Sequence, residues 1–222
     1  MFVNLSVNPA KPPRFLGEFG ALCQAGVLNE LTYHRGAEIF GEAEPAEYVY
    51  QVVEGAVRSY KLLSDGRRQI NAFHLAGDIF GLENEGVHRF TAEAIIDTRV
   101  RLLKRVSLAH IAETDALVAL DLFKMAANNL RHAEDHMLLL GRKTSHERVA
   151  AFLLEMDRRL SAAGVMALPM CRRDIADYLG LTLETVSRVL SALHEKGILG
   201  FIGQTQRQIV LLDRPKLAEL HH

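Results

Sequence analysis

A glutamate and an arginine, Glu184 and Arg188, lie four residues apart in a segment with helical periodicity, so their side chains share one helix face. An arginine there can donate two hydrogen bonds to guanine O6 and N7, and a glutamate can accept one from cytosine N4. Ser187, on the adjacent flank, can reach a base edge or a thymine methyl group. On an arbitrary helix the pair would instead be a solvated ion pair, stabilising by only about a few tenths of a kcal/mol. The surrounding elements therefore decide between the two interpretations.

The surrounding pattern predicts a helix-turn-helix. The stretch CRRDIADYLG precedes a short turn, and LETVSRVLSALHEKG follows it. The small side chain of Ala176 lets the two helices cross closely, and Gly180 opens the turn. After Gly197, a helix-ending glycine, apolar and polar residues alternate on either side of residues 203–205, which predicts a hairpin that serves as a wing.

Such a unit predicts a double-stranded DNA partner and specific roles for its side chains. The second helix enters the major groove by its N-terminal residues, and the start of the first helix faces the DNA backbone. The residues expected to read base edges are Leu183, Glu184, Ser187 and Arg188. The residues expected to contact phosphates are Arg172, Arg173, Thr182 and Thr185.

Cys171 lies at the start of the first of these helices, directly before Arg172 and Arg173. A helix N-terminus and two cations favour the thiolate, which is the reactive form of cysteine. Oxidation to a sulfinic or sulfonic acid would place a negative charge against a DNA phosphate. The sequence is equally compatible with a small, unreactive residue near the helix N-cap. Cys171 is therefore a candidate redox switch, whereas Cys23, in an apolar context, is expected to be packed.

An apolar repeat with spacings of three and four residues runs through residues 116–141 for more than three heptads. This period is typical of a helix that supercoils with a partner, and alanine at alternate positions permits close approach. The alternative is an amphipathic helix packed on its own domain, but the 3.5-residue period favours a parallel homodimer. The expected seam residues are Ala116, Ala119, Phe123, Ala126, Leu130, Ala133, Met137 and Leu140.

Between Leu31 and about Lys104, short apolar segments alternate with turn residues such as the hairpin loop at residues 64–66. Strands of this length and spacing predict a small β-barrel or roll. The chain is therefore expected to have an α+β fold in three parts. These are a β-roll sensor-like domain over residues 1–115, a dimerisation helix over 116–141, and a winged helix-turn-helix DNA-binding domain over 142–222.

The overall charge hides a basic C-terminal part. The 26 basic and 27 acidic residues give a net charge of −1, which by itself indicates no nucleic-acid partner. Residues 142–222, however, hold 12 Lys and Arg against 9 Asp and Glu. Two cysteines are too few for a disulfide framework, a four-cysteine zinc site or a cysteine-ligated iron–sulfur cluster built within one chain. Because the sequence has no secretory leader pattern and no apolar run near 18 residues, we expect a cytoplasmic protein without membrane contact.

With these motifs, the chain resembles the CRP/FNR superfamily of bacterial transcription regulators over nearly its whole length. The most specific stretch is DIADYLGLTLETVSRVLSALHEKGIL, in which Glu184, Ser187 and Arg188 match the FNR-like branch. The resemblance implies a cyclic-nucleotide-binding-like β-roll, a palindrome with TTGA-type half-sites, and mainly activation with RNA polymerase as partner. The loop over residues 62–68 stands where relatives touch the polymerase. Without an N-terminal cysteine cluster the chain looks closest to FixK-type regulators of rhizobia, which implies microaerobic and nitrogen-fixation-linked gene control.

The stretch GDIFGLENEGVHRFTAEAI differs from the phosphate pocket of the cyclic-AMP-binding relatives. Leu82 stands in place of the ribose-binding glutamate, and residues 90–92 are Phe-Thr-Ala in place of Arg-Ser-Ala. Arg89 is one position early, and on a strand that offset turns a side chain to the opposite face. Because a buried phosphodiester would then lack its arginine, no cyclic nucleotide is expected. We expect the roll to be a scaffold; the alternative is a ligand-gated regulator whose β-roll binds a small-molecule effector other than cyclic AMP.

The sequence does not predict an enzyme. The motifs G-x-S-x-G, H-E-x-x-H and G-x-G-x-x-G do not occur in it. Among the ten histidines, His132 and His136 have a spacing that metal ligands can use, and we interpret this pair as a solvated helix face. We therefore expect no metal and no cofactor.

Overall fold

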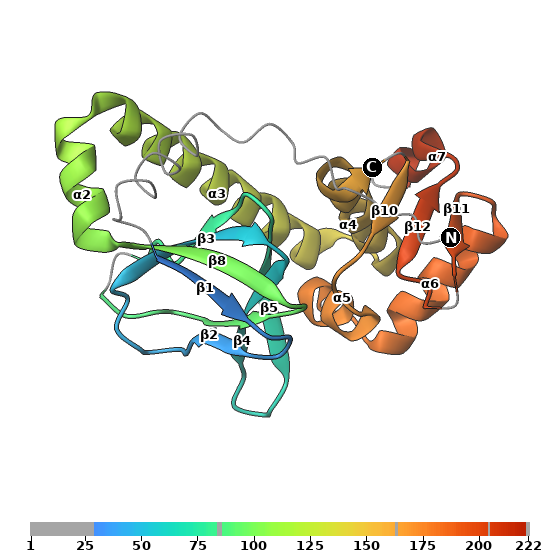
Figure 1. The fold of residues 1–222 in the computed structure, drawn as a ribbon. Coiled ribbons are helices and arrows are strands. Elements are labelled where there is room, and N and C mark those ends of the chain that lie inside the picture. The colour runs from blue at the N-terminus through green and yellow to red at the C-terminus, as the bar shows by residue number, and fades with distance from the viewer. Residues whose placement is uncertain (1–28, 84–85, 163, 204, 221–222) are drawn as a thin grey trace, which may run out of the picture. The chain divides into compact units, whose positions relative to one another are not determined.

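The computed structural model describes residues 29–83, 86–162, 164–203 and 205–220 (Figure 1). The N-terminal arm through residue 13 and Cys23 lie outside these residues. The chain divides into two compact units, one within residues 11–133 and the other within residues 134–222, and each is described by itself. No helix in the described residues is long and apolar enough to cross a membrane.

The first unit contains two four-stranded antiparallel sheets, so the β-roll prediction is confirmed. One sheet has the strand order β1-β8-β3-β6 and the other has the order β2-β7-β4-β5. Figure 1 shows β1, β8 and β3 in one layer and β2, β4 and β5 in the other. The strands are β1 (Asn29–Tyr33), β2 (Glu38–Phe40), β3 (Tyr48–Glu54), β4 (Ala56–Leu62), β5 (Arg68–Leu75), β6 (Ile79–Phe80), β7 (Thr91–Ala94) and β8 (Thr98–Lys104).

Aromatic rings fill the interior of the roll, because strand alternation turns them to the inner face. The ring of Phe40 stacks on His88 at a centroid distance of 3.5 Å, and Tyr50 stacks on Phe80 at 5.2 Å. Phe80 in turn stacks on His74 at 4.8 Å. Phe40 of β2 also lies 5.1 Å from Tyr50 of β3, centroid to centroid, so the rings form a continuous series that joins the two sheets.

Two helices follow the roll: α2 (Arg105–Thr114) and α3 (Ala116–Arg142). The side chain of Asp115 separates them, since it accepts hydrogen bonds from the backbone N–H groups of Leu117 at 2.8 Å and Val118 at 3.3 Å. An aspartate that accepts these bonds is a helix N-cap, so α3 begins directly after it. The side chain of Val118 is buried against Val49, Leu103 and Leu108 of the same unit.

The second unit packs helices against a small antiparallel sheet of order β11-β12-β10-β9. The buried face of its first helix is formed by Val149, Phe152, Leu153 and Met156, as its sequence period predicts. The elements are α4 (Ser145–Leu160), β9 (Ser161–Ala162), β10 (Val165–Ala167), α5 (Arg172–Leu179), α6 (Leu183–Glu195), β11 (Leu199–Ile202), β12 (Gln208–Leu211) and α7 (Arg214–Glu219). Helices α5 and α6 with the β11–β12 hairpin form the predicted winged helix-turn-helix.

Candidate nucleic-acid interface

The turn between α5 and α6 depends on a glycine and an alanine. Gly180 has a left-handed backbone with φ of +61°, which glycine adopts without a steric penalty. The backbone N–H groups of Gly180 and Leu181 both donate to the carbonyl oxygen of Ala176 and end α5. Ala176 is 2% exposed, so its small side chain occupies the close contact that the sequence predicts.

Helix α6 presents the predicted base-reading residues on its outer side. Its inner face is buried through Val186, Val189, Leu190 and Leu193. Glu184 and Arg188 are exposed on the other side, and Leu183 and Ser187 are half-buried at its edges. In the described part of the chain, Glu184 and Arg188 form no ion pair with each other. Both side chains are therefore available to a partner.

One of the two threonines predicted to contact phosphate also caps α6, and the other is its hydrogen-bond partner. Thr182 is the N-cap, and its hydroxyl oxygen accepts a hydrogen bond from the backbone N–H of Thr185 at 3.1 Å. The two hydroxyl oxygens lie 2.9 Å apart. This capping role was not predicted, although a threonine directly before an apolar-periodic segment is a recognisable signal for it.

Cys171 is the N-cap residue of α5 and is half-buried. Its backbone N–H donates to the carboxylate of Asp174 at 3.1 Å, and Asp174 is itself buried. This carboxylate places negative charge at the start of α5, beside the thiol and the two arginines that follow it. The Cys-x-x-Asp spacing resembles a capping box and could have indicated this N-cap.

The two arginines at the start of α5 differ in their surroundings. Arg173 is exposed, as a phosphate contact requires. Arg172 donates a hydrogen bond to the side-chain oxygen of Gln206, and its guanidinium lies 5.7 Å from the centre of the Phe201 ring. Gln206 and Phe201 belong to the hairpin, so Arg172 joins the helix-turn-helix to its wing. A contact between residues 34 positions apart leaves no local signal in the sequence.

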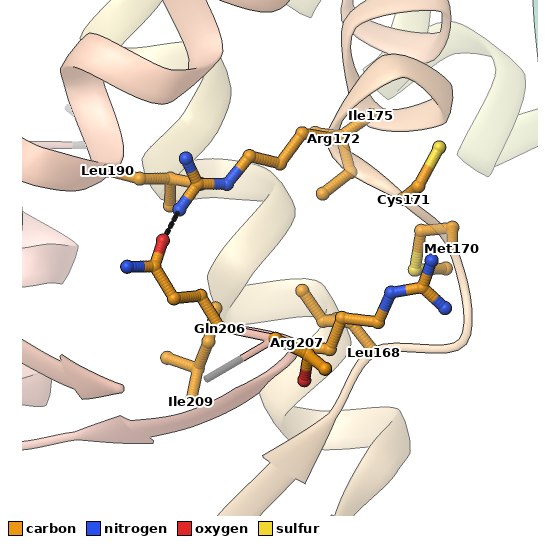
Figure 2. Close-up of a pocket in the computed structure, with 10 residues that line it drawn as sticks. Leu168, Met170, Cys171, Arg172, Ile175, Leu190, Gln206, Arg207 and Ile209 are labelled. Carbon is orange, nitrogen blue, oxygen red and sulfur yellow. Dashed lines mark hydrogen bonds between the residues drawn. The ribbon is translucent and has the colours of Figure 1, made fainter. Parts of the chain in front are cut away.

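A pocket of about 350 Å³ lies between the start of α5, α6 and the wing. Figure 2 shows the Arg172–Gln206 pair on one side of it and the guanidinium of Arg207 on the opposite side, near Met170. Cys171 also lines the pocket, and its sulfur points away from the Arg172–Gln206 pair (Figure 2). The lining residues are Leu168, Met170, Cys171, Arg172, Ile175, Leu190, Thr205, Gln206, Arg207 and Ile209.

The predicted dimer seam forms an apolar stripe along α3. Its large side chains are exposed in the single chain: Phe123 is 71%, Leu130 62% and Met137 65% exposed. Ala116, Ala126 and Ala133 are also exposed, and Ala119 and Leu140 are half-buried. These large apolar side chains are not buried on their own domain, which was the alternative interpretation of the repeat.

Leu82 and Arg89 belong to the segment whose sequence differs from the cyclic-AMP pocket of relatives. Leu82 is half-buried and packs against the core cluster of Val49, while Arg89 is exposed beside the ring of Phe90. The expectation that Arg89 lies on a strand is wrong, because β7 begins only at Thr91 and Arg89 lies in the bend before it.

The interpretation of His136 as a solvated residue is wrong. Its Nε2 lies 3.1 Å from the carbonyl oxygen of Tyr178, and the two rings meet edge to face at 4.2 Å. Burial raises the pKa of the Tyr178 phenol, which keeps that ring neutral. Among the described residues no group of three or more His, Cys, Asp or Glu side chains is placed to hold a metal ion.

A β-roll, a long helix and a winged helix-turn-helix define a class of protein, the DNA-binding transcription regulators. Two family models match this chain: a cyclic nucleotide-binding domain over residues 30–115 and a Crp-like helix-turn-helix domain over residues 147–220. The chain belongs to the CRP/FNR family of transcription regulators, and it is not an enzyme.

Several relatives within this family carry the name FixK. The chain is 45% identical to the nitrogen fixation regulation protein FixK of Azorhizobium caulinodans over 193 residues. This alignment covers 85% of this chain and 77% of that protein. It is 42% identical over 168 residues to the FixK of Rhizobium meliloti, covering 76% of each. The structure of FixK2 from Bradyrhizobium japonicum matches with a TM-score of 0.85 and 69% identity, covering 88% of this chain and 98% of that one.

Proposed function

We propose that this chain acts as a homodimer that binds a palindrome with TTGA-type half-sites and works mainly as an activator. The observation that carries the proposal is the exposed face of α6, where Glu184 and Arg188 flank the half-buried Ser187. These three side chains offer two donor groups and two acceptor groups to base edges. Exposed Arg173 and the hydroxyl groups of Thr182 and Thr185 would hold the adjacent phosphates.

The apolar stripe of α3 supports the dimer. Stable soluble proteins do not leave a row of large apolar side chains such as Phe123, Leu130 and Met137 in water without a partner. Pairing two copies through this row would bury them and give the twofold symmetry that a palindrome mirrors.

The experiment that tests this function is selection of bound duplexes from a random pool. The expected result is an inverted repeat of two TTGA-type half-sites at one fixed spacing. A selected site without symmetry, or a monomer that binds as well as the dimer, would contradict the proposal. Substituting Arg188 should change the selected base within each half-site and leave the spacing unchanged.

We also propose that the regulated genes belong to microaerobic and nitrogen-fixation-linked metabolism, and that RNA polymerase is the partner in activation. Relatives named as nitrogen fixation regulation proteins support the first part. The partnership with RNA polymerase is supported by the β4–β5 loop, where Leu62 and Leu63 are exposed and can be reached by another protein. In this loop Asp65 is held by Arg67, whose hydrogen bonds keep the pKa of that carboxyl low.

The roll is proposed as a scaffold that holds the dimer in its binding form. The rings of Phe40, Tyr50, Phe80, His74 and His88 fill the space between the sheets, and this packing favours a scaffold over the ligand-gated alternative. Leu82 and exposed Arg89 are poorly suited to a cyclic nucleotide. Thermal unfolding measured with and without cyclic AMP, cyclic GMP and other small effectors would reveal a ligand as a rise in melting temperature.

Oxidation of Cys171 is proposed to weaken DNA binding without unfolding the protein. The thiol is at the N-cap of α5, next to Arg172 and Arg173, where an added negative charge would repel a phosphate. The test compares DNA affinity before and after peroxide for the wild type and for Cys171→Ser. The wild type should lose affinity and the variant should keep it; equal losses would contradict the proposal.

A further inference from the structure

The guanidinium of Arg148, on the first turn of α4, joins the ends of two other helices. Its Nη2 donates to the carbonyl oxygen of Leu140, in the last turn of α3, at 2.8 Å, and its Nε donates to that of Lys143, the residue directly after α3, at 2.9 Å. Its Nη1 donates to the carbonyl oxygen of Leu179 at 2.9 Å, at the C-terminal end of α5. Residues 134–222 form one compact unit, so all four residues belong to the same body.

These bonds satisfy carbonyl groups that helix geometry leaves without a partner. The last four carbonyl oxygens of a helix have no intrahelical donor and carry partial negative charge, so a cation stabilises them. One planar guanidinium can serve several such groups at fixed angles. Arg148 is half-buried, and its Nε, Nη1 and Nη2 atoms each donate a hydrogen bond to a carbonyl oxygen of the protein. It is therefore not placed as a DNA phosphate contact.

The contact between Arg148 and Leu179 lies directly before the turn that leads into α6. Leu179 is followed by Gly180, the turn residue that sets the direction of α6, and a Cβ on Gly180 would lie 3.5 Å from both Arg148 Nη1 and Leu140 Cδ2. One turn earlier on α3, His136 lies 3.1 Å from the Tyr178 carbonyl oxygen. Of two successive carbonyl groups at the end of α5, that of Tyr178 thus contacts His136 of α3, and that of Leu179 accepts from Arg148 of α4, which also binds the end of α3.

We propose that Arg148 is a positioning residue that fixes the direction of α6 relative to the C-terminal end of α3. Because α3 carries the proposed dimer seam, Arg148 thereby sets the separation and phase of the two recognition helices across the dimer. The inference rests on the proposed function, since it assumes a homodimer on a palindrome. In this proposal Arg148 determines which spacing of the two half-sites the dimer binds, and the side chains of α6 determine which bases are recognised.

The test uses three variants of the full chain. Arg148→Gln removes the charge and most of the donors, whereas Arg148→Lys keeps the charge but cannot reach three carbonyl groups from one nitrogen. Arg158→Gln is the matched control, because Arg158 is an exposed arginine on the same helix. Affinities are measured on the selected palindrome and on palindromes whose centre is one base pair longer or shorter. Thermal unfolding and gel filtration accompany each measurement.

The quantity compared is the ratio of affinities for the selected spacing and the altered spacings. We expect both Arg148 variants to lower this ratio by about tenfold, the scale of losing one hydrogen bond to a charged group. Base preference within a half-site and the oligomeric state should stay unchanged, and Arg158→Gln should behave as wild type. A ratio unchanged in Arg148→Lys, or an equal loss of affinity on every duplex including non-specific DNA, would overturn the inference.

A second measurement does not depend on DNA. A spin label at exposed Ser191 of α6, introduced as Ser191→Cys with Cys23 and Cys171 changed to Ser, reports the distance between the two copies of α6. The labelled protein that keeps Arg148 should give a narrow distribution of distances between the two labels. Both Arg148 variants should give a broad distribution. An equally narrow distribution in the variants would overturn the inference. No distance between copies before any Arg148 change would instead show that the proposed dimer is wrong.

Discussion

Arg172 on α5 donates a hydrogen bond to Gln206 in the turn of the wing, and its guanidinium lies over Phe201 of β11. The side chain that the sequence assigns to a DNA phosphate is thus already bound within the protein. Its neighbour Arg173 is exposed. A DNA phosphate would therefore have to compete with Gln206 for Arg172, but it would not have to do so for Arg173.

The first prediction concerns this pair. Arg173→Ala should weaken binding to all DNA sequences by a similar factor and lower the slope of log affinity against log salt by about one, because one phosphate contact is lost. Arg172→Ala should lower affinity as well and also raise hydrogen exchange in the β11–β12 hairpin, which loses its anchor. Titrations at several salt concentrations and exchange measurements check both. An unchanged salt slope for Arg173→Ala would exclude it from the interface.

The second prediction concerns base reading. Arg188→Ala should cost about 1–3 kcal/mol per half-site and relax the preference at one base pair, since a bidentate contact with guanine is lost. Competition binding with duplexes that vary at each half-site position measures this loss. If specific binding survived in full, α6 would read bases through other side chains. Lys196→Ala, at the exposed end of the helix, is a suitable control.

The third prediction concerns the seam. Leu130→Asp should dissociate the dimer, because it places a charge in the centre of the apolar stripe, where burial without a partner is costly. Asn129→Asp adds the same charge to the neighbouring exposed position outside the seam and should leave the dimer intact. Sedimentation at several protein concentrations distinguishes the two. A dimeric Leu130→Asp would show that α3 pairs through other residues.

The fourth prediction concerns pH and the sheet of β1 and β8. The carboxylate of Glu30 accepts hydrogen bonds from Arg101 at 2.7 Å and from Arg99 at 3.2 Å, and these bonds lower its pKa. Because the pKa in the folded state is below that of the unfolded chain, the stabilisation is present above the ordinary glutamate pKa. It is lost as pH falls through the lowered folded-state pKa.

Glu30→Gln should therefore unfold more easily than the wild type at pH 7 and about equally at pH 3. The difference should be below about 1 kcal/mol, because the ion pair is partly solvated and screened. Denaturant titrations at the two pH values measure it. A difference that persisted undiminished at pH 3 would show that packing, and not the charge of Glu30, stabilises this edge.

Much of the architecture could be predicted from the sequence, because the signals are local and periodic. The two-residue alternation of β3, the heptad spacing of α3 and the Ala176–Gly180 turn each depend on neighbours a few positions away. The exposed face of α6 follows from the same periodicity, since burying Val186, Val189 and Leu193 turns Glu184 and Arg188 outward.

The contacts that link distant segments were decided only by the tertiary structure. Arg148 gave no signal as a residue that ties Leu179 to α3, and His136 looked solvated until its contact with Tyr178 was seen. A guanidinium or imidazole has the same local pattern on a helix whether it faces water or a carbonyl group 31 or 42 residues away. Periodicity thus determined which face of each helix is apolar, and folding decided which half-buried polar groups hold the helices together.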